Sequence, residues 1–390
     1  MVGFIRSNRR STVLLWVWFI LFGLASLWVT FHLVQNDVSK YQHYANRALT
    51  PPWFHYWPPE YPVLSQGVFL LPRLLPWSYR LSFALVTLVA LLGLLQIGLK
   101  RHGVKWGLKL MGYLSAGAIG LFSQRYDIVP SLCAFWALDQ AQQQHWKRAW
   151  MGSVLGFGLK LWPAMLWPVF LIQEWRETQR WHWDRLAYSL LAVGVLMGLP
   201  VLTDPRQSFT AWEYLLSRPI EVESVAASIS VLLGHFHLFY SYGSVNVQAH
   251  GWVRLISLML TGFGGVSVIW VWWQQSRGRI DLADSAILTL LLVLLASKIF
   301  SPQYLIWLAP WLALKKGNVF FILGFMTTTA EFPIAWMYWP TRVLVLVIAR
   351  NAWMLFGTGF FAAHAGLFSL RRKSPTNSNR KLFPTFSIKD

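Results

Sequence analysis

Long apolar segments recur along the whole chain, separated by short polar or basic ones. The first, residues 11–34, is long enough to cross a bilayer, since a membrane helix needs about 20 apolar residues. Comparable segments predict further membrane helices at residues 78–99, 106–122, 127–142, 185–202, 251–273, 282–300, 303–314, 319–336 and 343–370. The pattern predicts an all-α integral membrane protein of roughly 10–12 transmembrane helices, with one multi-pass domain over residues 1–370 and a disordered, basic cytoplasmic tail over residues 371–390.

Two apolar segments do not fit a simple span. Residues 63–75 are short and bounded by proline, which predicts a re-entrant or interfacial helix. Residues 149–174 are broken by glycine and by Pro163 and Pro168, and basic residues flank both ends. We expect a helical hairpin that enters and leaves on the same side, with its break covered by protein or by a cavity.

The basic residues decide the predicted orientation. The chain carries a net charge of +19, but its lysines and arginines lie mainly in short segments beside apolar ones, as in cytoplasmic loops. No basic stripe with interleaved aromatics is present, so a nucleic-acid partner is not expected. We therefore predict a cell-membrane protein with both termini cytoplasmic and two large external loops, at about residues 35–77 and 203–250, the second with two surface helices.

Composition excludes most other classes of protein. Hydrophobic residues make up 55% of the chain and charged residues 13%, which no soluble domain of this size shows. Cys133 is the single cysteine, so neither a disulfide framework nor a thiolate metal site is available. No nucleotide-binding motif or zinc-protease motif occurs. We expect no cofactor, although a divalent metal is compatible with the sequence.

Charged residues gather on the predicted external face, at the ends of apolar segments. A charge at the membrane boundary needs a partner or a water-filled cavity, so it is a candidate functional residue. For each of them, interfacial solvation or a structural ion pair is the alternative. The candidates are Asp37, Glu60, Arg125, Asp127, Arg218, Glu221, Glu223 and Lys298.

Seven short motifs, in order, resemble glycosyltransferase family 87, whose members are polyprenol-phosphate-mannose-dependent mannosyltransferase-like proteins with the GT-C membrane fold. The motifs are NDVSKYQHYA, EYP, RYDIVP, GLKLWP, RPIEVES, SKIFSPQYLIWLAP and ARNAWML. The resemblance implies an inverting transferase that takes a sugar from a polyprenyl phosphate at the external face. Its catalytic aspartate lies in the first external loop, the place that Asp37 occupies, and Glu60 is the nearest candidate for a second carboxylate.

The chemistry expected of such an enzyme agrees with these residues. Inversion needs one carboxylate, here Asp37, to accept the proton of the attacking hydroxyl. The departing phosphate needs cations, for which Lys298, Arg125 and Arg218 are the candidates. We expect transfer of a hexose, with mannose favoured, from a polyprenyl-phosphate sugar donor to a lipid or glycan acceptor. The full set of predicted substrate-binding residues is Glu60, Tyr61, Arg125, Asp127, Lys160, Arg218, Glu221, Glu223, Lys298, Gln303 and Tyr304.

A lipid-linked sugar flippase, or another multi-pass transporter, is the main alternative. Broken helices and charges within the membrane suit a transporter. The absence of a recognisable internal repeat and the two large loops on one side favour the enzyme instead. A membrane scaffold is a third possibility, but it has no need of Asp37 and Lys298 at these boundaries.

Overall fold

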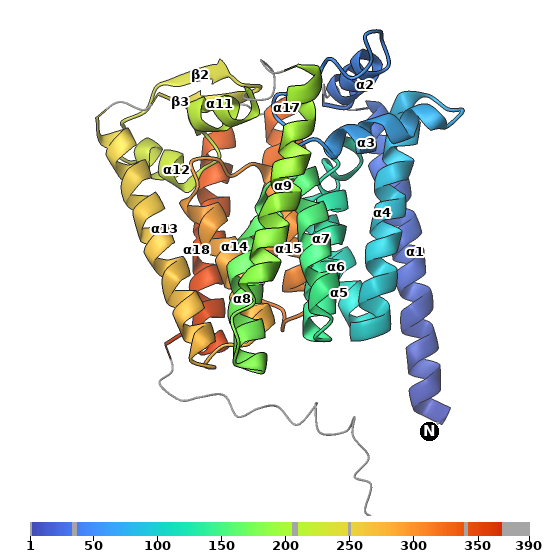
Figure 1. Cartoon of the computed structure of the whole chain (residues 1–390), viewed down its shortest axis with the longest axis vertical. Helices are drawn as coiled ribbons and strands as arrows, with labels where there is room; N and C mark the ends of the chain where they lie inside the picture. The colour runs from blue at the N-terminus through green and yellow to red at the C-terminus, as the bar shows by residue number, and fades with distance from the viewer. Residues whose placement is uncertain (1, 33–36, 205–209, 249–250, 339–341, 369–390) are drawn as a thin grey trace, which may run out of the picture.

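The structure is a computed structural model that describes residues 2–32, 37–204, 210–248, 251–338 and 342–368. Its helices stand side by side in one bundle (Figure 1). Six of the described segments are long and apolar enough to cross a membrane, which confirms the predicted helical, multi-pass membrane protein. They belong to α1 (Val2–His32), α4 (Tyr79–His102), α9 (Trp183–Thr203), α13 (Trp252–Ser276), the α16–α17 segment Val319–Tyr338, and α18 (Val343–Ala365).

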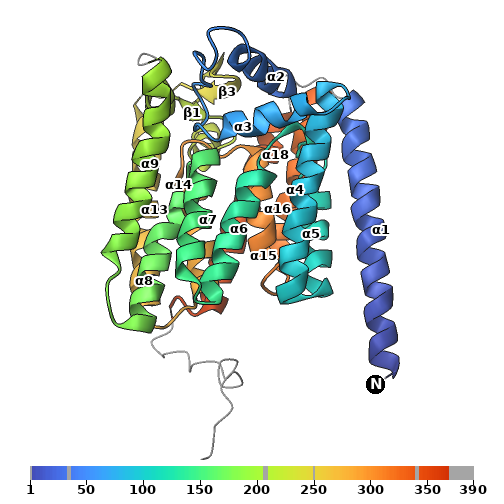
Figure 2. The ribbon, with the colours of Figure 1, turned by 45° about the vertical axis from the view of Figure 1, so that its right-hand side comes forward.

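Shorter apolar helices fill the bundle between the long ones (Figure 2). They are α5 (Val104–Gly117), α6 (Ile128–Gln142), α7 (Trp146–Leu159), α8 (Leu166–Thr178), α14 (Leu282–Ala296) and α15 (Leu305–Leu312). Every residue of α15 is buried, as expected of a helix that is apolar all round. These helices are too short to cross a bilayer unaided, because at 1.5 Å per residue a span needs about 20 residues. Their upper ends therefore stop within the protein and leave room for irregular segments.

The α7–α8 hairpin forms where the sequence predicted a broken segment. Its bend holds an extended Lys160 and a 3-10 turn, Trp162–Met165. Gly156 makes the bend possible, since a Cβ there would lie 3.0 Å from Cγ of Pro163. Carbonyl groups freed at the bend find donors: the Leu64 amide lies 2.9 Å from the Gly158 oxygen, and a tyrosine hydroxyl reaches Leu159. The surrounding protein thus satisfies the break, as membrane depth requires.

A cap of small elements covers one end of the bundle, at the top of Figure 1. It contains α2 (Asp37–Ala48), α3 (Ser65–Leu70), α11 (Thr210–Ser217) and α12 (Val225–Leu232). The last two are the two helices expected in the second loop, but α12 is mostly buried and is not a surface helix. It also contains an antiparallel sheet of β1 (Ile220–Glu221), β2 (Leu238–Ser241) and β3 (Ser244–Val247), in the order β1-β3-β2. The all-α prediction missed this small sheet.

An aromatic cluster fixes α2 on the bundle. The buried residues of α2 recur every three or four positions, so α2 turns one apolar face inward. Tyr41 on that face stacks on Phe69 of α3 with ring centroids 4.5 Å apart, and it meets Tyr126 edge-on at 5.7 Å. Residues 63–75, predicted as a re-entrant or interfacial helix, thus contain the helix α3, which packs against α2. This packing fixes the position of Asp37, the first residue of α2.

A buried ion pair joins α18 to the cap. Arg350 lies 3.1 Å from Glu331, and both side chains are fully buried. Arg350 also donates to the backbone oxygens of Glu223 and Phe300, and Asn351 donates to the same Glu223 oxygen at 3.1 Å. The Arg-Asn pair of the last motif therefore anchors the segment that follows β1.

We predict that Arg350→Met lowers the free energy of unfolding by about 3–5 kcal/mol, because it leaves the buried carboxylate of Glu331 without its cation. Unfolding of the purified protein in detergent measures this. Arg254→Met, which removes an exposed arginine of α13, is the matched control and should change stability by less than about 0.5 kcal/mol. Equal losses in the two variants would contradict the structural role of Arg350.

Candidate functional site

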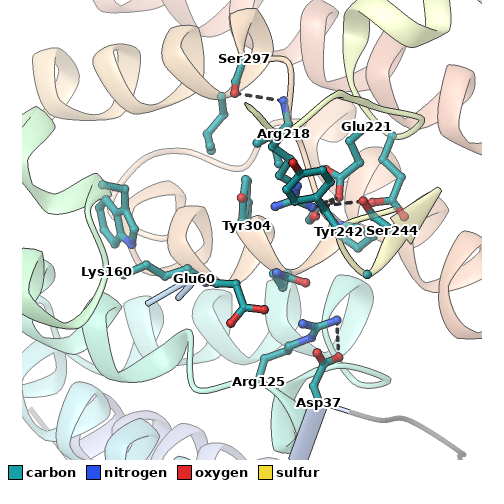
Figure 3. Close-up of a pocket in the computed structure, with 18 of the residues that line it drawn as sticks. Asp37, Glu60, Arg125, Lys160, Arg218, Glu221, Tyr242, Ser244, Ser297 and Tyr304 are labelled. Atoms are coloured by element: carbon teal, nitrogen blue, oxygen red, sulfur yellow. Dashed lines mark hydrogen bonds and ion pairs between the residues drawn. The ribbon is translucent and has the colours of Figure 1, made fainter. Parts of the chain in front are cut away.

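A cavity of about 510 Å³ lies beneath the cap, at the end of the bundle where α2, the α7–α8 bend and the β2–β3 hairpin meet (Figure 3). This volume is typical of sites that bind a small molecule. Charged side chains are unusually frequent in its wall. They are Asp37, Lys40, Glu60, Arg125, Lys160, Arg218, Glu221 and Glu223.

Asp37 and Arg125 form an ion pair on one side of this cavity, with Oδ2 of the carboxylate 2.6 Å from the guanidinium (Figure 3). Asp37 is the first residue of α2, where the helix dipole favours a negative charge. Arg125 directly follows the 3-10 turn Phe122–Gln124, in an extended conformation, and its side chain lines the cavity. Each side chain keeps about a fifth of its surface exposed, so the pair lies at the wall and not in the core.

Glu60 ties the first loop to α2. Its carboxylate accepts hydrogen bonds from the Lys40 ammonium and the Tyr44 hydroxyl. Burial, together with the negative charge of Glu60, raises the pKa of Tyr44 far above its ordinary value, so the hydroxyl stays a donor. The proline-rich loop that ends in EYP therefore has a fixed position over the cavity.

Lys160 and Asp127 pair at the bend of the hairpin. The two side chains approach to 2.5 Å, and Nε1 of Trp307 donates to the same carboxylate oxygen. Asp127 is fully buried and does not line the cavity, whereas Lys160 does. The lysine also lies over the rings of Tyr126 and Trp307, at 5.2 and 5.0 Å. Asp127 thus positions Lys160, which presents its charge to the cavity.

Arg218 and Glu221 form the opposite wall. The guanidinium donates to Oε1 of Glu221 at 2.9 Å, and the Ser301 hydroxyl donates to the same oxygen at 2.7 Å. Burial, reinforced by the negative charges of Glu221 and Glu331, raises the pKa of Glu223 well above its usual range. This wall therefore carries one ionic pair and one carboxyl group that tends to stay protonated.

Of the four remaining predicted site residues, three line the cavity and Lys298 does not. Tyr61, Gln303 and Tyr304 line it. Lys298 lies beside it, with its ammonium donating to the Leu216 oxygen at 3.0 Å. The chain is extended after α14, so successive side chains point in opposite directions: Ser297 and Ile299 face the cavity and Lys298 faces away.

Comparison with known proteins gives the family. The model of glycosyltransferase family 87 matches residues 60–298, which is more than half of the chain. The chain belongs to glycosyltransferase family 87. The resemblance inferred from the sequence motifs is confirmed, and the protein is a membrane glycosyltransferase. Family membership favours the enzyme over the transporter alternative.

Similarity to solved structures is weak. Two crystal structures of ArnT from Cupriavidus metallidurans, one bound to undecaprenyl phosphate and one in the apo state, share 13% and 15% sequence identity with this glycosyltransferase. Each alignment covers 90% of this chain and 77% of the other, with TM-scores of 0.48 and 0.47. No curated protein matches this chain.

Sequence reasoning missed several residues of the site in this glycosyltransferase. Lys40 lies three residues after Asp37, one helical turn along α2, and that spacing could have indicated it. Trp162 belongs to the GLKLWP motif and stacks on Trp307 at 5.1 Å. The hairpin residues Tyr240, Tyr242 and Ser244 gave no signal, because the sheet itself was not expected. Among the described residues, no group of three or more His, Cys, Asp or Glu could hold a metal ion.

We predict that Asp127→Asn destabilises this glycosyltransferase by about 3 kcal/mol, because Lys160, with 15% of its side chain exposed, then loses its charged partner. The double variant Asp127→Asn/Lys160→Met removes both charges and should recover at least about 1 kcal/mol. Asp184→Asn, at an exposed position, is the control, with little change expected. Denaturant unfolding measures the wild type and these three variants, and a double variant no more stable than Asp127→Asn would contradict the pairing.

Proposed function

We propose that this glycosyltransferase moves a hexose, with mannose favoured, from a polyprenyl-phosphate sugar to a lipid or glycan acceptor, with inversion at the anomeric carbon. The observation that carries the proposal is one cavity that combines the carboxylate of Asp37 with the cations Arg125, Lys160 and Arg218. Glycosyl transfer from a lipid phosphate needs both: a base for the acceptor and positive charge for the leaving group. The family membership and the undecaprenyl phosphate bound to ArnT agree with such a donor.

The proposed step balances as a single displacement. The acceptor oxygen attacks the anomeric carbon, the bond from that carbon to the phosphate oxygen breaks, and polyprenyl phosphate leaves with the electron pair. Asp37 takes the acceptor proton. Arg125 holds the Asp37 carboxylate through one oxygen, Oδ2, and so fixes its orientation in the wall. A general base contributes typically 10²–10⁴-fold to the rate.

We assign the leaving phosphate to the cations that line the cavity. Lys160 is held by Asp127, which accepts one of the three donors that an ammonium carries. Arg218 and Arg125 add guanidinium groups, whose fork suits phosphate oxygens. The contact of Lys298 with the Leu216 oxygen, outside the cavity wall, supports Lys160 in the role that the sequence analysis gave to Lys298.

The proposed orientation places the cavity at the external face, with both termini cytoplasmic. The charges support it. Basic clusters occur at the other end of the bundle, where α4 ends in Lys100 and Arg101 and where α7 begins with Lys147 and Arg148. Such clusters mark cytoplasmic ends. The tail at residues 371–390, proposed as cytoplasmic, lies outside the described residues.

We predict that Asp37→Asn lowers transfer by about 10²–10⁴-fold, because asparagine cannot take the proton. Its amide oxygen can still accept from Arg125, so the unfolding temperature should hardly change. Radiolabelled polyprenyl-phosphate mannose and a membrane lipid extract supply donor and acceptors. Glu213→Gln, an exposed carboxylate on the same face, is the control and should keep full activity. Transfer by the Asp37 variant within a few-fold of the wild type would exclude Asp37 as the base.

We predict that Lys160, in the cavity wall, and Lys298, outside it, behave differently. Lys160→Met, made in the Asp127→Asn background to keep the protein folded, should lower turnover about 10²-fold or more relative to that background. Lys298→Met should stay within about threefold of the wild type, because its ammonium contacts only a backbone oxygen among the described residues. Single-turnover transfer measures both, and the reverse order of effects would return the leaving-group role to Lys298.

We predict that His55→Cys, but neither Lys147→Cys nor Gln66→Cys, is labelled by an impermeant thiol reagent on intact cells, all in a Cys133→Ser background. His55 is exposed at the cavity end and should react, whereas Lys147 is exposed at the opposite end and should react only after lysis. The buried Gln66 is the control for burial and should react in neither state. Labelling of position 147 before lysis would place the site on the cytoplasmic side.

A further inference from the structure

The β2–β3 hairpin leans over the cavity and contributes two tyrosines to its wall. Tyr240 lies on β2 and Tyr242 in the turn, and both line the cavity although they keep 75% and 39% of their surface exposed. In Figure 3, Tyr242 and Ser244 lie beside Glu221 and Arg218, on a different side of the cavity from Asp37 and Arg125. The hairpin tyrosines are therefore aromatic surfaces that face the space in which a substrate would sit.

The conformation of the turn is unusual for a tyrosine. Tyr242 and Gly243 connect the strands, and both have positive φ, at 53° and 71°. A two-residue turn with positive φ at both positions normally carries Asn-Gly, because a bulky side chain is strained there. Turn geometry gives no reason for an aromatic ring at position 242. Strain of this kind persists mainly at sites where the side chain has a task.

The surrounding side chains hold this turn rigidly. The Tyr214 hydroxyl donates to the Tyr242 backbone oxygen at 3.0 Å, and the two rings meet edge-on at 5.1 Å. Burial raises the pKa of Tyr214 to about 12, so its hydroxyl keeps the proton that it donates. Asn246 donates to the backbone oxygens of Ser241 and Ser244 at 2.8 and 2.9 Å. The ring of Tyr242 is thus held in place before any ligand arrives.

A buried acceptor group lies next to these rings. Arg218 bridges the hairpin to Glu221, reaching Ser244 at 3.4 Å and Oε1 of Glu221 at 2.9 Å. Oε2 of Glu221 is buried and has no hydrogen-bond partner in the part of the chain that the structure describes, although the residue lines the cavity. A buried carboxylate oxygen without a donor is costly, so a ligand hydroxyl is its natural partner.

We propose that Tyr240, Tyr242 and Glu221 form the acceptor subsite and that the acceptor presents a pyranose ring there. The C–H face of a sugar ring packs against an aromatic face, and a ring hydroxyl donates to Oε2 of Glu221. This inference rests on the proposed function, since it assumes that Asp37 takes the proton of an acceptor bound across the cavity. It narrows the acceptor from any lipid or glycan to a molecule with a carbohydrate head.

Tyrosines at this depth also serve as membrane anchors, with the ring at the headgroup level. An anchor acts only in a bilayer, whereas a subsite acts in detergent as well. The two roles therefore separate in a kinetic measurement on the detergent-purified protein.

The test uses Tyr242→Asn, which installs the residue that the turn prefers and so should fold at least as well as the wild type. The donor is radiolabelled polyprenyl-phosphate mannose, and the acceptors are octyl α-mannoside, octyl β-glucoside and a membrane lipid extract. We expect Tyr242→Asn to raise the acceptor KM about tenfold or more while the donor KM stays within about threefold. Tyr242→Phe keeps the ring and should restore most of the acceptor affinity. Phe239→Ala, on β2 of the same hairpin but outside the cavity wall, should match the wild type.

Each outcome has a defined meaning. An unchanged acceptor KM in Tyr242→Asn would overturn the subsite. So would a wild type that transfers sugar to the extract but neither uses the octyl glycosides nor is inhibited by them. A wild type that consumes no polyprenyl-phosphate sugar with any acceptor would instead overturn the proposed function itself.

Discussion

The ion pair between Lys160 and Asp127 is the contact on which the site depends. A lysine at the bend of a broken helical hairpin would be costly near the membrane without a partner, and a fully buried aspartate would be equally costly without a cation. Pairing solves both problems and leaves the ammonium at the cavity wall. The hairpin can bend there because Gly156 lets Pro163 approach and because Leu64 and Tyr126 satisfy the freed carbonyls. The bend of the hairpin and the ion pair with Asp127 together therefore fix the position of the Lys160 ammonium and keep it charged.

Ion pairs also join the elements that form the other walls of the cavity. Glu60 joins the proline-rich loop to Lys40 and Tyr44, and Arg218 joins the hairpin to Glu221. Asp37, Glu60 and Glu221 are thus each paired with a cation, whereas the Glu223 side chain is not paired with any described cation. A cavity built in this way keeps its charges fixed, which suits stabilisation of the charge that develops on a departing phosphate.

The sequence predicted the long helices, the broken hairpin and the end of the bundle at which charges collect, because apolar periodicity and basic clusters are local signals. It also indicated the charged residues of the cavity wall with the exception of Lys40, because charges are conspicuous in a mainly apolar chain. It could not give the direction of a side chain. Lys298 faces away from the cavity because the chain is extended there, and its neighbour Ser297 faces inward. The sheet was missed because strands as short as β1, with two residues, carry no pattern of their own.

The most direct measurement of the central claim is the fate of the bond between sugar and phosphate in a single turnover. Purified wild-type protein, reconstituted in lipid vesicles, is mixed in excess with polyprenyl-phosphate mannose of known anomeric configuration and with octyl α-mannoside as acceptor, and the product is analysed by NMR. From direct displacement we predict that free polyprenyl phosphate appears together with a glycoside of the opposite anomeric configuration. Retention of configuration would contradict direct displacement with Asp37 as base, and intact donor moved between leaflets would identify a transporter.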